Sequence, residues 1–159
     1  MKTVKTNALR LLEQAKIPYE LRTYEVEEGQ YDGMLIVPKI GLLPHQVFKT
    51  LVLKGERNGY LVCCLPVDRE LDLKKVAAVF HDKKVEMLPM KDLLPLTGYV
   101  RGGCSPVGMK KQFPTFFDAS ITSQSLVSFS AGQRGMQMLV NPEKVKEYIH
   151  ATVADLTAE

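Results

Sequence analysis

The stretch of the chain best suited to hold a substrate by its backbone is Gly102-Gly103-Cys104-Ser105-Pro106-Val107-Gly108, with three glycines and one proline in seven residues. Glycine lets a backbone approach a ligand closely, and proline fixes the shape of a loop. The peptide groups could therefore serve as binding groups, although a tight turn between two strands would have the same composition. The stretch lacks the Gly-Lys-Ser/Thr ending of a Walker A loop and the Rossmann glycine spacing.

Lys49 is the second candidate, because it stands between Phe48 and the apolar run Leu51-Val52-Leu53. A lysine at the boundary of a buried segment commonly extends its ammonium group to water. If the side chain instead points into a cleft, it can hold a phosphate or polarise a carbonyl group as a fixed positive charge. Both interpretations remain open from the sequence.

The remaining nucleophiles are cysteines and serines. Cys104 could be a nucleophile, since loop amides might stabilise its thiolate, but no histidine is near it in the sequence. Cys63 and Cys64 lie in an apolar run and are most simply core residues. Ser128 and Ser130 alternate with apolar residues, so both face the same side of one strand, and they could share a cleft with the glycine-rich stretch.

Metal and disulfide sites are not expected. The three cysteines and three histidines show no Cys-x-x-Cys or His-x-x-x-His spacing, so neither a zinc site nor a cofactor is predicted. An odd cysteine number without a disulfide framework is typical of a reducing cytoplasm. No run approaches the roughly 20 apolar residues of a membrane span, and no signal peptide is recognisable.

The bulk composition predicts one globular domain over residues 1–159, with 45% hydrophobic and 25% charged residues. The formal net charge of +3 permits an RNA partner, but many enzymes with neutral partners have the same charge. Charge alone therefore does not decide the class of partner.

Periodicity and turn residues predict the elements that carry these candidates. Helices or helical turns are expected at 4–16, 44–48, 73–80, 90–96 and from 142 onward. Strands are expected at 19–25, 50–54, 60–65, 85–88, 115–118, 126–130 and 136–140, with 99–101 extended. Residues 34–43 are ambiguous, because their apolar content suits a helix but includes Pro38. Clustered strands without regular βαβ alternation favour an α+β fold with a mixed, mainly antiparallel sheet.

Several ordered blocks of the chain resemble the YbaK/EbsC group of Cys-tRNA(Pro) deacylases. They are Val47-Phe48-Lys49-Thr50-Leu51-Val52, Leu71–Ala77, Lys83–Met87 and the long block from Thr97 to Lys111. The resemblance extends from about Leu9 to Ile149. It implies a mixed sheet or partly closed barrel flanked by helices, as in the editing domain of prolyl-tRNA synthetase.

The resemblance also implies an activity: hydrolysis of the ester that joins cysteine to tRNA(Pro), in trans to the synthetase, with the substrate's own thiol as attacking group. The implied partners are the aminoacylated 3′ end of tRNA and prolyl-tRNA synthetase, without a membrane or a metal. Deacylation of another mischarged tRNA, such as Ala-tRNA(Pro), and a non-catalytic tRNA- or synthetase-binding module are the alternatives.

The site residues implied by the resemblance are Lys49 as the catalytic lysine, followed by Thr50, and the Gly-x-x-x-Pro loop. That loop falls on Gly102, Gly103, Cys104, Ser105 and Pro106. Tyr24 on the first strand and Ser130 are matched to pocket positions. Two departures stand out: Gln137 occupies a pocket position that is acidic in the best-known member, and Pro38 is expected to interrupt a helix before Lys49.

Overall fold

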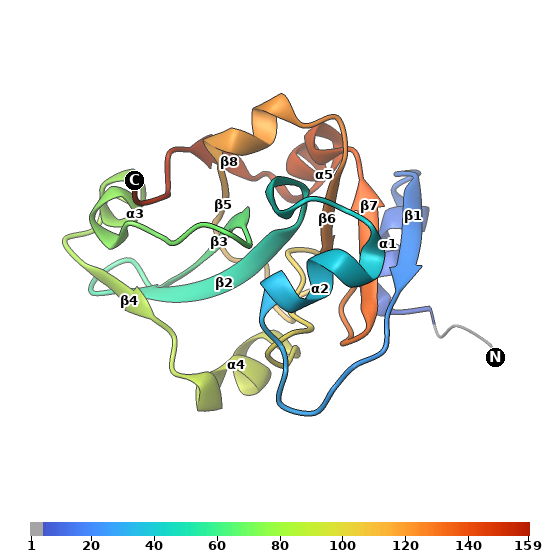
Figure 1. Ribbon diagram of the computed structural model, residues 1–159. Coiled ribbons are helices and arrows are strands. Elements are labelled where there is room, and N and C mark those ends of the chain that lie inside the picture. The colour runs from blue at the N-terminus through green and yellow to red at the C-terminus, as the bar shows by residue number, and fades with distance from the viewer. Residues whose placement is uncertain (1–4) are drawn as a thin grey trace.

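Two β-sheets form the centre of the molecule (Figure 1). The computed structural model describes residues 5–159, so Val4, in the first predicted helix, lies outside the described residues. The larger sheet has the order β4-β2-β3-β5-β8, with bounds Val85–Met87, Phe48–Gly55, Tyr60–Pro66, Thr115–Asp118 and Thr152–Ala154. The smaller sheet has the order β1-β7-β6, with bounds Tyr19–Thr23, Met136–Val140 and Val127–Ser130.

The predicted α+β class with mainly antiparallel pairing is confirmed, but the strands form two sheets and not a closed barrel. β1, β7 and β6 pair antiparallel, as do β4, β2 and β3, whereas β5 joins β3, and β8 joins β5, in parallel. A single parallel bridge between Val47 and Ser128 connects the two sheets. It brings the start of β2, which carries Lys49, beside the strand of Ser128 and Ser130.

Five α-helices and two 3₁₀ helices are found in residues 5–159. They are α1 (Asn7–Gln14), α2 (Gly33–Ile40), α3 (Leu73–Val79), α4 (Met90–Thr97), α5 (Pro142–Ile149), η1 (Pro44–Gln46) and η2 (Ala119–Ser123). Their ends follow local signals. The Asp72 side chain accepts from the amides of the first turn of α3, Asn141 does the same for α5, and Gly98 ends α4 at φ +85°. None of these helices is long and apolar enough to cross a bilayer.

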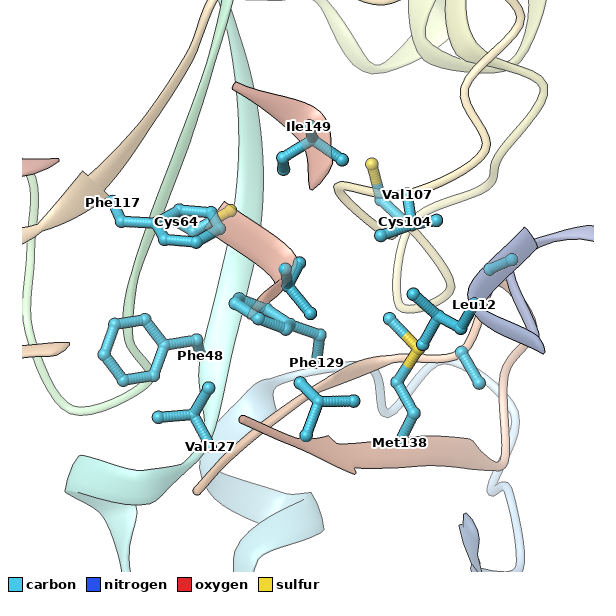
Figure 2. Packing of buried hydrophobic residues seen from close by; sticks show 14 of the residues in the cluster. Leu12, Phe48, Cys64, Cys104, Val107, Phe117, Val127, Phe129, Met138 and Ile149 are labelled. Atoms are coloured by element: carbon cyan, nitrogen blue, oxygen red, sulfur yellow. The ribbon is translucent and has the colours of Figure 1, made fainter. Parts of the chain in front are cut away.

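Both sheets contribute to one apolar core (Figure 2). Phe129 of β6 packs against Phe48 of β2 and against Phe117 of β5, with ring centroids 6.1 and 5.4 Å away. The second cluster packs α3 against the opposite face of the larger sheet, around Leu53, Leu61 and Phe116. Aromatic contacts across the two sheets fix their mutual orientation.

The expectation that Pro38 interrupts its helix is wrong. α2 continues from Gly33 through Pro38 to Ile40 and ends at Gly41, whose φ is +70°. In a helix of two turns, proline at this position removes only the bond that would reach the Met34 carbonyl. The Asp32 side chain offsets part of that loss by accepting from the Met34 amide at 2.9 Å.

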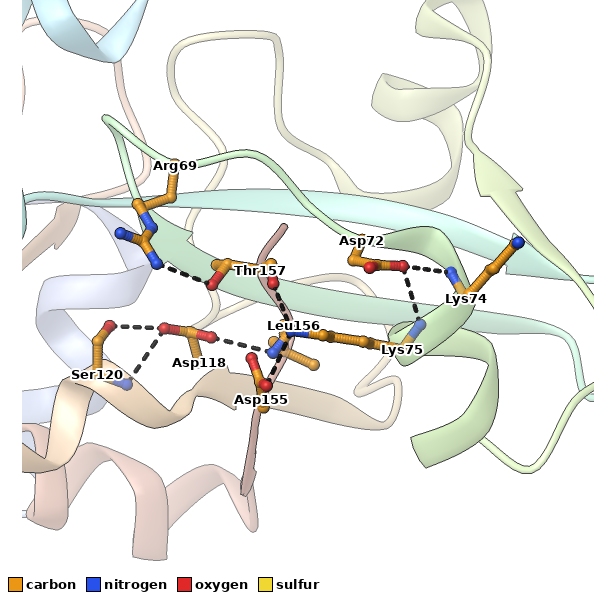
Figure 3. Close-up of polar contacts among 9 residues, drawn as sticks. All are labelled: Arg69, Asp72, Lys74, Lys75, Asp118, Ser120, Asp155, Leu156 and Thr157. Atoms are coloured by element: carbon orange, nitrogen blue, oxygen red, sulfur yellow. Dashed lines mark hydrogen bonds and ion pairs between the residues drawn. The ribbon is translucent and has the colours of Figure 1, made fainter. Parts of the chain in front are cut away.

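The C-terminal residues add a strand that periodicity did not predict. β8 extends the larger sheet, and after it Leu156 is completely buried. Figure 3 shows how polar contacts hold this segment: the buried Asp118 carboxylate accepts from the Leu156 amide at 3.0 Å and from Ser120. Lys75 donates to Asp155 at 2.9 Å and to the Thr157 carbonyl at 2.8 Å.

Candidate active site

A cleft of about 440 Å³ lies beside the start of β2. Its walls come from α2, residues 49–52 of β2, α4, the glycine-rich stretch and the neighbouring ends of β6 and β7. The volume falls in the range of small-molecule sites, and the lining combines apolar side chains with few polar groups. Six residues predicted for the site line this cleft together: Lys49, Thr50, Gly102, Cys104, Ser130 and Gln137.

Lys49 supplies a positive charge in the lining of the cleft. Its side chain is 24% exposed, and Nζ lies 3.8 Å from Oε1 of Glu70, whose side chain is 87% exposed. An ion pair with so exposed a carboxylate contributes little free energy, so the ammonium group is free to exchange partners. The neighbouring Thr50 hydroxyl lies 3.6 Å from the Cys64 Sγ.

The two glycines that open the loop are required by close packing. Gly102 has φ +84°, and a Cβ there would lie 3.0 Å from the Cβ of Tyr31. A Cβ on Gly103 would lie 3.2 Å from the Arg134 amide nitrogen. Gly102 and Cys104 reach the cleft, whereas Gly103, Ser105 and Pro106 do not line it.

The remaining loop positions hold the turn together. The Gly103 amide donates to the Val100 carbonyl at 2.9 Å, and the Ser105 hydroxyl oxygen accepts from the Val107 amide at 3.3 Å. Ser105 and Val107 are completely buried. The loop is therefore a rigid wall of the cleft.

Cys104 lines the cleft as an uncharged thiol. Burial raises the pKa of its thiol to about 12, so the group stays protonated near neutral pH. No histidine lines the cleft in the described chain, so no side chain of that type is in place to remove the proton.

Ser130 and Gln137 face each other across β6 and β7. The Gln137 carboxamide oxygen accepts from the Ser128 hydroxyl at 2.6 Å, and the Ser130 hydroxyl oxygen accepts from the Gly132 amide at 3.2 Å. All three side chains are more than nine-tenths buried.

Tyr24 is a further predicted site residue that does not line the cleft. It follows β1, where its amide donates to the Gly135 carbonyl at 2.9 Å, and its side chain packs against the apolar cluster around α2. The cluster contains Ile36, Val37 and Ile40 of α2, and Ile36 also lines the cleft, so Tyr24 packs beside the wall that α2 forms.

Tyr31 and Arg101 line the cleft but were not predicted. The Arg134 guanidinium carbon lies 3.7 Å from the centroid of the Tyr31 ring, and its Nε donates to the Arg101 carbonyl at 2.8 Å. These two contacts of Arg134 join three loops that are far apart in the sequence. In the sequence, the signal for a charged group in this wall of the cleft is Arg101, which directly precedes Gly102 and Gly103.

No group of three or more His, Cys, Asp or Glu side chains is arranged for metal binding within residues 5–159. The charged residues in the lining of the cleft are Lys49, Arg101 and Asp32.

Comparison with known proteins identifies relatives over nearly the whole chain. A protein of Enterococcus faecalis, EbsC, named for a proposed Cys-tRNA(Pro)/Cys-tRNA(Cys) deacylase activity, is 43% identical over 155 residues, covering 98% of this chain and 94% of EbsC. The proline–tRNA ligase of Fervidobacterium nodosum is 35% identical over 71 residues, which are 45% of this chain and 12% of the ligase.

The fold has solved counterparts as well. The crystal structure of a proposed trans-editing enzyme for prolyl-tRNA synthetase superposes with a TM-score of 0.82 at 21% identity, covering 99% of this chain and 100% of that one. The aminoacyl-tRNA editing domain family matches residues 36–148. These findings confirm the resemblance to YbaK/EbsC proteins, and the chain belongs to the aminoacyl-tRNA editing domain family.

Proposed function

We propose that residues 1–159 form one editing domain that hydrolyses mischarged aminoacyl-tRNA, with Cys-tRNA(Pro) as substrate. One observation carries the proposal: Lys49 and the rigid glycine loop, which meet from distant parts of the sequence, line a single cleft of about 440 Å³. The name of EbsC, 43% identical to this chain, supports the choice of a cysteinyl ester.

The chemistry needs no nucleophile from the protein. The substrate's cysteine sulfur attacks its own carbonyl carbon, the ester C–O bond breaks, and the departing tRNA oxygen takes up the thiol proton. Water then opens the resulting β-thiolactone to free cysteine. Positioning an attacking group in this way can lower a barrier by roughly 7–11 kcal/mol.

The cleft supplies the positioning. Lys49 anchors the terminal adenosine and the ester carbonyl by its charge, and the loop from Gly102 to Pro106 orients the aminoacyl group against the opposite wall. Thr50 and Ser130 shape the pocket, and Gln137 replaces an ionic contact with a neutral one. The protonated state of Cys104 supports attack by the substrate thiol over attack by the enzyme.

Recognition of the tRNA body is assigned to a partner. A net charge of +3 supports only modest affinity for RNA, so docking on prolyl-tRNA synthetase would deliver the substrate in trans. The match to part of proline–tRNA ligases supports that partner. Three free cysteines, all buried, suit the cytoplasm in which charged tRNA is used.

The test is a deacylation assay with Cys-tRNA(Pro), Ala-tRNA(Pro) and Cys-tRNA(Cys). Wild-type protein should release cysteine and leave the alanyl ester intact, because alanine has no thiol. Lys49→Ala should slow turnover about 10²–10³-fold if the ammonium group stabilises the carbonyl oxygen. Lys54→Ala, on the same strand but outside the cleft, is the matched control and should keep full activity. Hydrolysis of the alanyl ester would contradict the thiol mechanism, and no hydrolysis at all would favour a binding module.

A further inference from the structure

The inner wall of the cleft contains three buried polar side chains on two neighbouring strands. Ser128, Ser130 and Gln137 are 1%, 7% and 4% exposed. Ser130 and Gln137 are cross-strand partners, and both line the cleft. Ser128 does not line the cleft but is hydrogen-bonded to Gln137. A polar group buried to this degree is costly unless its hydrogen-bonding groups find partners.

Two of the residues that line the cleft, Gln137 and Ser130, keep a donor that the hydrogen bonds of this cluster do not use. The Ser128 hydroxyl donates to Oε1 of Gln137, and no acceptor within residues 5–159 takes a hydrogen bond from the Gln137 Nε2. Ser130 Oγ accepts from the Gly132 amide, and its own hydroxyl proton has no acceptor within the same residues. The wall therefore presents an N–H donor and an O–H donor side by side.

The residues that line the cleft do not supply a free carboxylate that could accept hydrogen bonds from these two donors. Asp32 is the carboxylate in its lining, and its side chain is engaged with the Met34 amide at the start of α2. Glu70 contacts Lys49 but does not line the cleft. Within the described residues, the Gly103 amide is already bonded to Val100 and Pro106 has no amide hydrogen, so the loop offers fewer donors than its sequence suggests.

We infer that Ser130 and Gln137 bind the carbonyl oxygen of the substrate ester and stabilise the negative charge that develops on it, and that Ser128 is a positioning residue for Gln137. The inference rests on the proposed deacylase function. A carbonyl oxygen accepts hydrogen bonds and gains charge when sulfur attacks, so two fixed donors stabilise the transition state more than the substrate. Ser128 acts by holding the carboxamide oxygen, which turns the NH₂ group toward the cleft.

Gln137→Met tests the catalytic role, because methionine keeps the volume of glutamine and removes the donor. We expect kcat to fall about 10²–10³-fold with KM changed far less. Gln14→Met, on the exposed end of α1, is the matched control and should change neither constant. If Gln137→Met does not fold, as judged by circular dichroism, Gln137→Leu replaces it.

A binding experiment separates this role from a structural one. The probes are 3′-amino-3′-deoxyadenosine carrying a 2-aminobutyryl amide, an unreactive mimic of the cysteinyl ester, and the matching thioamide, whose sulfur is a weaker acceptor. Wild-type protein should bind the amide about three- to tenfold more tightly than the thioamide. Gln137→Met should bind both equally, Ser128→Ala should lose part of the preference, and Ser128→Thr, which keeps the hydroxyl, should retain it.

The outcomes distinguish the inference from the proposed function. Wild-type deacylation together with unchanged kcat in Gln137→Met, or an amide preference that survives this substitution, would overturn the inference and leave the function standing. Failure of wild-type protein to bind the amide at all would also count against it. Absence of deacylation by wild-type protein would instead refute the proposed function. The preference for the amide over the thioamide would still show whether the cleft donates hydrogen bonds to a carbonyl oxygen.

Discussion

At the scale of single residues, the proposed chemistry relies on a lysine and on neutral donors, while the cysteine in the cleft stays protonated. Burial raises the pKa of Cys63 and Cys104 to about 12 and raises that of Cys64 as well. Thiols in this state neither attack esters nor bind metals near neutral pH. A protonated Cys104 agrees with the proposed attack by the substrate's own thiol.

Cys104→Ser should therefore keep wild-type turnover within a few-fold, because serine retains the size of the buried group. The same pKa predicts slow alkylation of Cys104 by iodoacetamide at pH 7 to 9, since the thiolate forms only as pH approaches about 12. Deacylation kinetics and mass spectrometry of alkylated protein measure the two effects. An inactive Cys104→Ser that still folds would move the nucleophile into the enzyme.

Gly102→Ala should impair both folding and turnover. The position has φ +84°, and the added Cβ would meet the Tyr31 Cβ at 3.0 Å. A left-handed conformation alone costs an L-residue roughly 1–2 kcal/mol. Urea denaturation should show at least this loss in the free energy of unfolding, and turnover should fall further because the loop wall shifts. A variant with wild-type stability would show that the loop accommodates a side chain.

At the scale of elements, the C-terminal segment completes the larger sheet. β8 pairs in parallel with β5, the Asp72 amide donates to the Leu156 carbonyl at 2.8 Å, and the Ala158 amide donates to the Glu70 carbonyl at 2.9 Å. The same segment thus holds residues 70–72, which include the carboxylate beside Lys49. Loss of this segment should therefore disturb the residues beside Lys49 as well as the larger sheet.

Leu156→Ala should destabilise the protein by about 2–5 kcal/mol, the usual cost of truncating a completely buried leucine. Leu43→Ala is the matched control, because Leu43 is 58% exposed and should change stability very little. Thermal or urea unfolding of both variants gives the comparison. Equal stability of the two variants would mean that the C-terminal segment does not belong to the cooperative unit.

At the scale of the whole molecule, the charge distribution limits how the protein meets RNA. The net charge is only +3, and three cations stand at or beside the cleft: Lys49 and Arg101 in its lining, and Arg134 stacked on Tyr31. Contacts with phosphates release counterions, so affinity for RNA falls with salt in proportion to their number. A small number of phosphate contacts therefore predicts that the affinity for RNA depends only weakly on salt concentration.

When the logarithm of the affinity is plotted against the logarithm of the salt concentration, each phosphate contact with a single strand contributes about 0.7 to the slope. Three cations therefore predict a slope of magnitude near 2 for the single-stranded acceptor end. Arg134→Gln should reduce the slope by roughly 0.7, and Lys54→Gln, at a residue that does not line the cleft, should leave it unchanged. The measurement is the dissociation constant of uncharged tRNA(Pro) from about 50 to 200 mM salt. A slope several times larger would reveal a tRNA surface beyond the cleft.

The amino-acid sequence by itself determined the features that depend on neighbours along the chain. The β2–β3 hairpin follows from Asn58-Gly59, where Gly59 has φ +81°, and the starts of α3 and α5 follow from the side chains of Asp72 and Asn141. Short-range hydrogen bonds settle such elements, so they are readable from sequence. The ordered blocks around Lys49 and Gly102 likewise sufficed to predict the family.

Only the tertiary structure decided what depends on contacts between distant segments. β8 was not predicted, because its three residues become a strand only when β5 offers an edge and Asp118 accepts from the Leu156 amide. Tyr24 packs against the apolar cluster that includes α2 and does not line the cleft. The hydrogen bond from Ser128 to Gln137 is set by the pairing of β6 with β7. Long-range burial and cross-strand register select these partners, and neither is encoded in the local pattern of one segment.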